Sequence, residues 1–483
     1  MNTSRYVGVV FLIILLFISG CQMGFDLELK KKPRENIYLT VEITGDIPEK
    51  GLNIDLPFGL SPRKLTWFDL LRQLDRASYD KNVDGIIMKI RYSDLSLSKI
   101  YELKKAINHL KSKGKETILY FDYASTKDLM LTGVFDKVFC NPSGIISCLG
   151  FRLDAIFFKE TMDKLGIKWD VIQMKEYKNA MEPFVNDTLT DTSKMVYNSI
   201  LDIIYERFKD GVIGEKVSDD NLQKALDKGI LLPKEARKLG FVDSILYEAE
   251  LDEMYQDQTL ELTAYSSSPR GRTEKSIALL YAMGPISIAI EKRFGEAVSA
   301  DDMTEILEKL EDDNDVKAVV MRVISPGGSA IASDIIWHNL REFKKPVVVS
   351  FGEMAASGGY YIGMAGDKVL TTPYSLTGSI GVIFSKANME GLYQKLGINR
   401  QTITRGKRAD MFSEYRSLSR TERELMESRI RAIYQDFVTK AAESRGVSVD
   451  SMEQIAKGRL WIGAQAEAIG LVDTTGGLMD AID

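Results

Sequence analysis

Residues 134–150 read VFDKVFCNPSGIISCLG, and residues 365–381 read AGDKVLTTPYSLTGSIG. Asp-Lys-Val stands near the start of both stretches and glycine at the end of both, so each position of the first corresponds to a position 231 residues later. Leu165-Gly166-Ile167 returns at the same offset as Leu396-Gly397-Ile398. Looser matches keep this order at offsets of 230 and 233, LGFVD (239–243) with IGLVD (469–473) and DGIIMKI (84–90) with KAVVMRV (317–323). The chain is therefore predicted to be two diverged copies of one domain.

Within each copy, short β-branched runs alternate with longer helical patterns. In the second copy the order is AVVMRV, SDIIWHNLREF, PVVVSF and KVLTTP. This alternation predicts an α/β fold, a tandem duplication of a βαβ domain with parallel strands flanked by helices. The predicted divisions are a signal segment at 1–20, a tether at 21–35, the first copy at 36–264, a linker at 265–275 and the second copy at 276–483.

The overall composition excludes some classes of function. The 483 residues carry 63 Lys and Arg against 69 Asp and Glu, a net charge of −6, which gives no footprint for nucleic acid. Only two histidines occur, His109 and His338, and both fall in helix-like runs typical of surface or packing residues. A Ser-His-Asp triad or a histidine metal site would need one of them. We therefore expect neither a metal nor a cofactor.

The N-terminus has the pattern of a targeting segment. Arg5 precedes an apolar run, 7–18, that is too short to span a bilayer comfortably. Cys21 follows Ile-Ser-Gly, which resembles the lipobox of bacterial lipoproteins, where the cysteine is lipidated. An uncleaved anchor is the alternative. Either way, we expect the body to be held at a membrane, outside the cytoplasm. The other two cysteines are Cys140 and Cys148, and their spacing alone does not show whether they form a disulfide.

Two glycine-rich turns follow predicted strands in the second copy, SPGGS (325–329) and MAASGGY (354–360). A nucleophilic serine needs an exposed Oγ, small neighbours and backbone N–H groups that receive an oxyanion, and Ser357 fits this description. In the first copy the Ser357 position falls on Thr126 or Lys127, and the Pro-Gly-Gly positions fall on 93–95. A purely structural turn would persist in both copies, so the glycine turns are interpreted as functional.

A serine nucleophile requires a base, and with histidine disfavoured the remaining option is lysine. Lys178 lies in the segment MKEYKNAMEPF (174–184) and corresponds to Ala409 in the second copy. The nearby Lys175 corresponds to Gly406 and is the next candidate. An ordinary lysine is neutral in only about one molecule in 2,500 at pH 7, and lowering its pKa to ~7 requires roughly 4–5 kcal/mol of ammonium destabilisation. Burial against apolar surface can supply this.

Four strings, which in chain order are YKNAMEPF (177–184), SPGGS, AASGGYY (355–361) and TGSIGV (377–382), resemble the long, two-copy form of bacterial signal peptide peptidase A. The resemblance covers nearly the whole mature chain. It implies the crotonase-like fold shared with the Clp protease, a Ser/Lys dyad, no cofactor, signal peptides as substrates and a homo-oligomer, by resemblance a tetramer. The residues it assigns are Ser357 as nucleophile, Lys178 as general base, Ser379 as the partner of the lysine, and the amides of Gly358 and of Gly328 or Gly327 as oxyanion donors.

The sequence departs from that family in two places. A lipobox stands where better-known members carry a transmembrane anchor, and Ile324 precedes the SPGGS turn at a position that is often polar. Two alternatives remain: a crotonase-type enzyme acting on acyl thioesters, and an inactive peptide-binding membrane scaffold. The Ser-x-x-Lys strings at 78–81 and 96–99 lack the companion motifs of penicillin-recognising enzymes and are interpreted as helix starts.

Overall fold

The computed structural model describes residues 36–51, 65–256, 258–265, 275–289 and 297–483. The predicted signal segment, the tether with Cys21, and all but the two end residues of the predicted linker lie outside these described residues. Within the described part of the chain, no helix is both long and apolar enough to cross a membrane.

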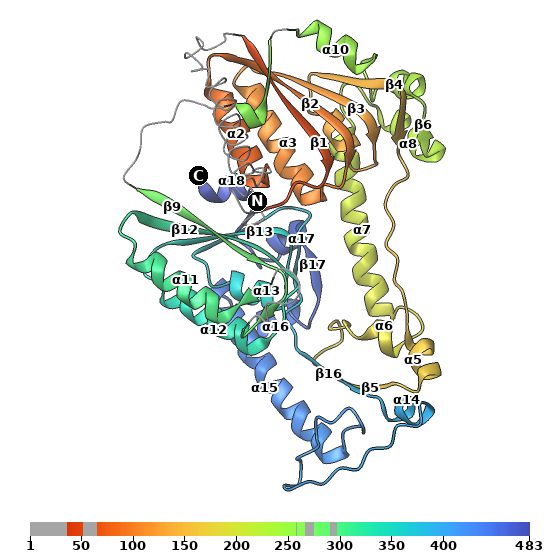
Figure 1. Ribbon diagram of the computed structural model, residues 1–483, viewed down its shortest axis with the longest axis vertical. Coiled ribbons are helices and arrows are strands. Elements are labelled where there is room, and N and C mark those ends of the chain that lie inside the picture. The colour runs from red at the N-terminus through yellow and green to blue at the C-terminus, as the bar shows by residue number, and fades with distance from the viewer. Residues whose placement is uncertain (1–35, 52–64, 257, 266–274, 290–296) are drawn as a thin grey trace, which may run out of the picture.

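The first copy forms a seven-stranded sheet (Figure 1). Its central strands, in the order β4-β3-β2-β1, pair in parallel: β1 (Ile37–Gly45), β2 (Val83–Ser93), β3 (Glu116–Ala124) and β4 (Lys137–Ser147). The short strands β6 (Ile230–Leu231), β7 (Ser244–Ile245) and β8 (Thr259–Glu261) extend the edges. Apart from the segment between β4 and α8, which is described below, the helices of this copy are α2 (Trp67–Tyr79), α3 (Leu97–Ser112), α4 (Leu129–Thr132), α8 (Asp219–Lys228), α9 (Pro233–Leu239) and α10 (Glu248–Met254), with a 3-10 turn at Leu262–Ala264.

The second copy repeats this plan. Its seven-stranded sheet consists of β9 (Ser276–Met283), β12 (Val316–Ser325), β13 (Val347–Ala356), β14 (Lys368–Thr371), β15 (Leu376–Gly378), β17 (Leu460–Ile462) and β18 (Thr474–Thr475). A small parallel pair, β10 (Ile286–Ser287) and β11 (Val298–Ser299), lies beside it. The helices are α11 (Ala300–Asp312), α12 (Ala330–Glu342), α13 (Gly358–Gly363), α15 (Arg420–Arg445), α16 (Val449–Ile455), α17 (Gly463–Ala468) and α18 (Leu478–Ile482).

Strand register confirms the duplication. Ala124 pairs with Ile146 in the first copy, and Ala355 pairs with Thr377 in the second, so both partners differ by 231. Many helices begin at a serine or threonine whose side chain accepts the N–H of the third helical residue, as Thr190 and Ser419 do. The central strands are mostly buried on both faces, as expected for a parallel sheet covered on both sides.

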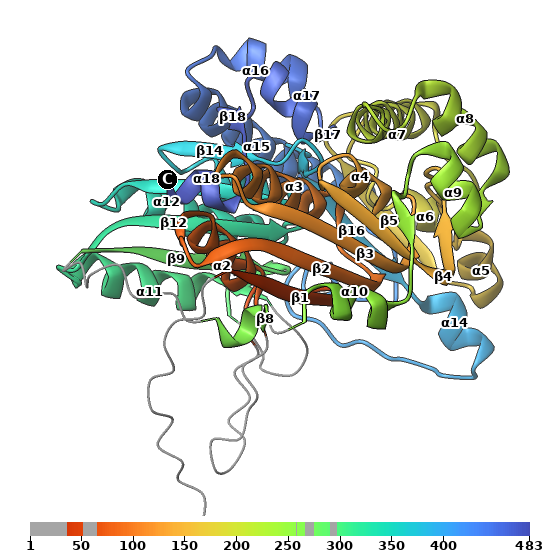
Figure 2. The same cartoon turned by 90° about the horizontal axis from the view of Figure 1, so that it is seen from above.

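The two copies pack against each other through apolar and ionic contacts. Val320, Leu370 and Leu478 of the second copy belong to the apolar core of the first. Figure 2 shows helix α18 of the second copy lying beside α2 and α3 of the first. Arg322, fully buried, donates to Glu49 and Glu102 of the first copy at distances of 2.8–3.1 Å. The copies therefore form one body, with β12 held directly against the first copy.

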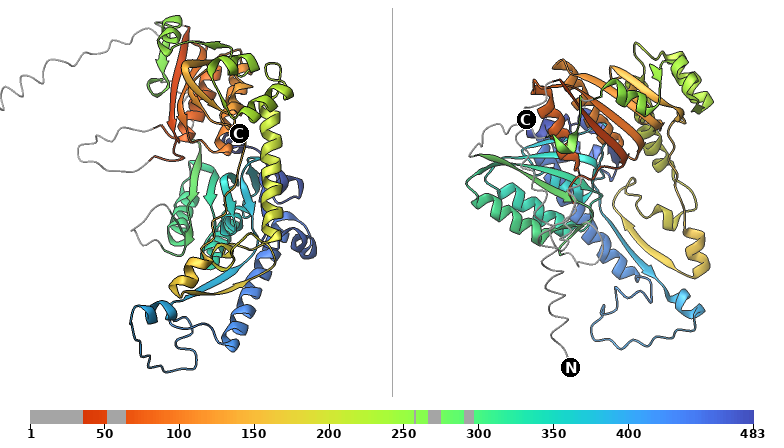
Figure 3. Two further views of the ribbon diagram at one scale, coloured as in Figure 1. Left: turned by 90° about the vertical axis from the view of Figure 1, so that its right-hand side faces the viewer. Right: turned by 45° about the horizontal axis from the view of Figure 1, so that its top comes forward.

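One part of the first copy reaches across the second. After β4 the chain runs through 148–158 into α5 (Lys159–Leu165), β5 (Lys168–Gln173), α6 (Glu182–Val185) and the long α7 (Asp191–Val212). β5 pairs antiparallel with β16 (Ile383–Asn388), which precedes α14 (Glu390–Lys395) of the second copy. Figure 1 shows this two-stranded ribbon below the two sheets, and Figure 3 shows α7 running alongside both copies. The crossing carries the Lys178 segment to the second copy.

Candidate active site

Ser357 lies in a sharp turn between β13 and α13. Its backbone has φ 55° and ψ −118°, a conformation that costs a non-glycine residue about 1–3 kcal/mol. The Ser357 amide donates to Gly378 O at 2.9 Å, and Ser357 O accepts from the Tyr361 amide at 2.9 Å. These bonds to β15 and α13 hold the strained turn, which lifts the hydroxyl away from the strand.

The structure brings Lys178, Ser357 and Ser379 together. Lys178 Nζ is 2.9 Å from Ser357 Oγ, 2.9 Å from Ser379 Oγ and 2.9 Å from Ser379 O. An ammonium would donate all three hydrogens here. A neutral amine can donate two hydrogens to the Ser379 oxygens and accept the Ser357 hydroxyl proton with its lone pair. The geometry therefore suits proton transfer from Ser357 to Lys178.

Burial lowers the pKa of Lys178 to about 8, and the side chain is only 6% exposed. Compared with its ordinary value of 10.5, this shift corresponds to about 3.4 kcal/mol of ammonium destabilisation. About one molecule in ten then holds a neutral Lys178 at pH 7. The pKa of Lys178 is thus lowered somewhat less than to the value of ~7 considered from the sequence. Its cause is burial, as the sequence analysis expected.

Two glycines make room for the lysine. A Cβ at Gly458 would lie 2.7 Å from both the backbone N and the Cβ of Lys178, and Gly458 has φ 79°. A Cβ at Gly381 would lie 3.1 Å from Lys178 Cδ. Ser379 itself has φ 50°, and its amide donates to Arg459 O at 2.7 Å. The loop before β17 therefore packs against the base and also orients its serine partner.

The hydrogen bonds of the SPGGS turn distinguish between the two oxyanion candidates. The Gly327 amide donates to Ser325 Oγ at 3.1 Å and is therefore occupied. Neither the Gly328 nor the Gly358 amide donates to another residue in the described part of the chain. A Cβ at Gly358 would lie 3.1 Å from Gly328 N, so these two amides are neighbours. The structure favours Gly358 and Gly328 as the donor pair.

The described residues of the first copy do not form an equivalent site. Thr126 takes the Ser357 position, but its hydroxyl donates to Ser147 O at 3.4 Å and accepts from the Leu149 amide at 2.9 Å. Cys148 takes the position of Ser379. Cys148 and Cys140 are free and buried, and burial raises the pKa of each thiol to about 12.

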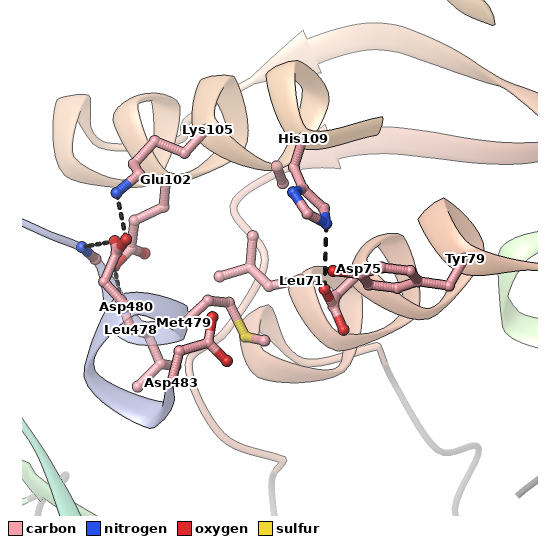
Figure 4. Close-up of a pocket in the computed structure, with 12 residues that line it drawn as sticks. Leu71, Asp75, Tyr79, Glu102, Lys105, His109, Leu478, Met479, Asp480 and Asp483 are labelled. Atoms are coloured by element: carbon pink, nitrogen blue, oxygen red, sulfur yellow. Dashed lines mark hydrogen bonds and ion pairs between the residues drawn. The ribbon is translucent and has the colours of Figure 1, made fainter. Parts of the chain in front are cut away.

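The other sequence candidates lie elsewhere. Lys175 Nζ forms an ion pair with Glu453 at 2.5 Å and does not join the serine cluster. His109 lines a cavity of about 250 Å³ between α2, α3 and α18, where Figure 4 shows it directed at Asp75, 3.7 Å away. His338 lies on α12 beside Trp337 and Arg341. Among the described residues, no cluster of three or more His, Cys, Asp or Glu could hold a metal.

Sequence reasoning missed some residues that shape this site. Gly458 was not recognised, since nothing near it in the sequence indicates contact with a lysine 280 positions earlier. Asn179 and Glu182 were quoted within YKNAMEPF but given no role, although both make several hydrogen bonds beside Lys178. A carboxylate inside a motif that carries a proposed base was the available signal.

A known protein family matches a region in each of the two copies. The model of peptidase family S49 matches residues 109–260 and 339–483. The chloroplastic serine protease SPPA of Arabidopsis thaliana is 30% identical over 94% of this chain and 69% of its own length. Protease 4 of Haemophilus influenzae is 29% identical over 87% of this chain and 73% of its own. A putative signal peptide peptidase SppA of Enterococcus faecium is 38% identical over 37% of this chain and 52% of its own.

Proposed function

Because the chain belongs to peptidase family S49 and is a serine protease, we propose that it is an endopeptidase with a Ser357/Lys178 dyad. The observation that carries the proposal is the 2.9 Å contact between Ser357 Oγ and the buried Lys178 Nζ. Ser379 fixes the amine through its hydroxyl and carbonyl. No metal or cofactor enters this chemistry.

The reaction follows from these contacts. Neutral Lys178 takes the Ser357 proton while Oγ attacks the peptide carbonyl carbon, and the oxyanion accepts hydrogen bonds from the Gly358 and Gly328 amides. When the C–N bond breaks, the Lys178 ammonium gives its proton to the leaving amine. Lys178 then takes a proton from water, which attacks the acyl ester, and the proton returns to Ser357 Oγ as the acid leaves. Protons and bonds balance without another reactant.

For the substrate we propose signal peptides after their release, and similar apolar peptides. Support comes from the four sequence strings and from the Enterococcus faecium relative, a putative signal peptide peptidase. We also propose that Cys21 is lipidated and that the protein is anchored at the cell membrane, facing outside the cytoplasm. The support is the apolar run and the Ile-Ser-Gly-Cys pattern at 18–21.

A homo-oligomer, by resemblance a tetramer, is proposed as the assembled form. In the repeat, β5 of the first copy corresponds to residues 399–404 of the second, and β16 of the second copy corresponds to residues 152–157 of the first. Neither of these two stretches forms regular secondary structure. No backbone N–H of these two stretches donates to a described residue, and Ile403 is 88% exposed. Pairing of 399–404 with 152–157 of a second chain would repeat the internal contact in a heterologous way.

That pairing predicts a register. Phe384 pairs with Ile172 inside the chain, so Leu153 should face Ile403 of another chain. Leu153→Cys chains mixed with Ile403→Cys chains should form a disulfide-linked dimer on mild oxidation, whereas Thr402→Cys, one residue out of register, should not. A disulfide confined to a single chain in the double variant, or a monomeric mass in light scattering, would rule the pairing out.

A fluorophosphonate probe on the full chain tests the enzymatic proposal. Mass spectrometry should find the label on Ser357, and Lys178→Ala should label far more slowly. An acyl-thioester enzyme without a nucleophile, or an inactive scaffold, would leave Ser357 unmodified. Absence of label from the wild type at pH 8–9 would refute the dyad.

A further inference from the structure

Lys178 is held by a segment that has no regular secondary structure. Residues 174–181 lie between β5 and α6, and Lys175 within them has φ 70°. A cavity of about 180 Å³ adjoins the lysine, with Ser193, Val196 and Leu460 among its other walls. Lys178 could therefore shift toward this space or be hydrated from it, unless neighbouring side chains fix the segment.

A hydrogen-bond chain beside Lys178 provides that restraint. Asn179 Nδ2 donates to Ser193 Oγ at 2.9 Å, and Ser193 Oγ donates to the buried carboxylate of Glu182. The Thr190 amide, at the start of α7, donates to the other Glu182 oxygen. Asn179 also lies within 3.2 Å of Thr192 Oγ1. Asn179 and Glu182, which both follow the lysine in the chain, are thus tied to the first turn of α7.

The donors and acceptors of this series of hydrogen bonds are fixed, because a carboxylate can only accept hydrogen bonds. With Glu182 ionised, the Ser193 hydroxyl must point its hydrogen at Glu182 and its lone pairs at the Asn179 amide. Burial raises the pKa of Glu182, but hydrogen bonds from Ser193 and Thr190 outweigh this and leave the pKa below its usual value. The carboxylate is therefore ionised at neutral pH, and the direction is fixed.

We propose that Glu182 and Asn179 are positioning residues for the base: acting through Ser193, they hold the Lys178 segment against Gly458 and keep the amine out of water. The inference rests on the proposed function for its kinetic consequence, but not for the hydrogen bonds themselves. Neither residue touches Ser357, so each acts through Lys178.

The surroundings of Lys178 are consistent with this division of roles. Burial lowers the pKa of Lys178, and the hydrogen bonds of its amine go to Ser357 and Ser379 rather than to Glu182. Charged or titratable groups surround the segment on every side. Within it are Lys175, Glu176 and Tyr177, and facing it are Glu182 on α6, Tyr197 on α7, Tyr434 on α15, Glu453 on α16, and Lys457 and Arg459 ahead of β17. Loosening the segment should hydrate the amine and raise its pKa.

Glu182→Gln tests the proposal, because the amide places N–H groups where only an acceptor fits. In the full chain, kcat/KM should fall about 10- to 100-fold, the order of loss from a misplacement near 1 Å, with KM changed much less. The kinetic pKa should rise by roughly one unit as the amine is hydrated. Asn179→Ala should shift it in the same direction.

Asp128→Asn is the matched control. Asp128 is also buried, accepts from the Ser125 amide at 2.9 Å and from the Ser125 hydroxyl, and lies beside the inactive Thr126 position. The Asp128→Asn substitution should lower Tm, as Glu182→Gln does, but should leave the dependence of kcat/KM on pH unchanged. A Glu182→Gln enzyme with lowered Tm but the wild-type kinetic pKa and plateau would overturn the proposal; if that variant does not fold, Asn179→Ala decides by the same criterion.

Competitive acetylation provides a readout that does not depend on turnover. The rate of Lys178 modification against pH, followed by mass spectrometry, gives the pKa of the amine directly. The pKa of Lys178 should be higher in Glu182→Gln and Asn179→Ala than in the wild type, but unchanged in Asp128→Asn. An equal Lys178 pKa in all three variants and the wild type would refute the positioning role. Failure of the wild type to label at Ser357 would instead refute the dyad, so the two failures are distinguishable.

Discussion

Replacing Lys178 with methionine should abolish activity and yet stabilise the folded protein at neutral pH. In the fold the pKa of Lys178 is lowered from 10.5 to about 8 by burial, so at pH 7 the protein must either bury an ammonium or release its proton. Methionine has a similar length and fills the same space without a charge. The variant should therefore be more stable than the wild type where the lysine is protonated.

The magnitude follows from the two pKa values. Because the folded-state pKa is the lower one, the unfolded state binds more protons between pH 8 and 10.5, and wild-type stability rises with pH across this window. The lowered pKa of Lys178 reduces the free energy of unfolding of the wild type by about 3.4 kcal/mol well below pH 8. This loss falls to about 0.8 kcal/mol at pH 10. Methionine loses all three hydrogen bonds of Lys178 Nζ, but the half-buried Ser357 hydroxyl can replace its bond with one to water. Losing the two hydrogen bonds to Ser379 therefore offsets about 2 kcal/mol of the gain at every pH. The net stabilisation by Lys178→Met should be about 1 kcal/mol at pH 7 and reverse sign by pH 10.

Urea unfolding at pH 7, 8.5 and 10 measures this difference. Comparing the variant with the wild type at each pH cancels titrations that the two proteins share. Ser357→Ala is the control, since it is equally inactive but retains the buried amine, and its difference from the wild type should stay nearly constant. A Lys178→Met difference that does not change by at least about 1.5 kcal/mol between pH 7 and 10 would refute burial as the cause of the lowered pKa.

Three further predictions concern the site itself. Lys178→Arg should be as inactive as Lys178→Ala, because guanidinium cannot accept the proton, while wild-type kcat/KM should rise with pH through about 8 and level off; substantial activity in the arginine variant would place the base elsewhere. Gly458→Ala should reduce kcat by at least about tenfold, since its Cβ would lie 2.7 Å from the Lys178 backbone, and steady-state kinetics that match the wild type would contradict this. Residues 36–264 and 276–483 expressed separately should each be silent toward a fluorogenic peptide and a serine probe, and full activity of 276–483 alone would contradict a dyad shared between the copies.

The duplication and the α/β class could be read from the sequence because a repeat needs only internal comparison. The repeat placed the counterpart of Ser357 at Thr126 or Lys127, and the strand register, with its offset of 231, selects Thr126. Lys178 was identified by elimination and resemblance, and the structure places it 2.9 Å from Ser357 Oγ. The repeat and the scarcity of histidine can both be read from residue types alone, whereas the role of Lys178 stays a prediction.

Other features depend on contacts between distant segments. The Gly327 amide is occupied by Ser325 Oγ, a bond that exists only once the turn has folded, so the sequence left Gly327 and Gly328 as alternatives. Gly458 and Lys178 meet because β5 and β16 pair across the copies. A lysine pKa is likewise set by surrounding atoms, most of them remote in sequence. No local pattern could have supplied these facts.

The crossing of the first copy over the second explains why one site remains where a duplication would provide two. Lys178 reaches Ser357 only because 165–184 leave the first copy and dock on the second. The corresponding stretch of the second copy has Ala409 in place of the lysine, and its residues 399–404, which correspond to β5, form no strand pair with any described residue. Thr126, whose hydroxyl is already paired, needs no base. Restoring a second site would therefore require a lysine, a free serine hydroxyl and a docked segment at once, and no single substitution provides all three.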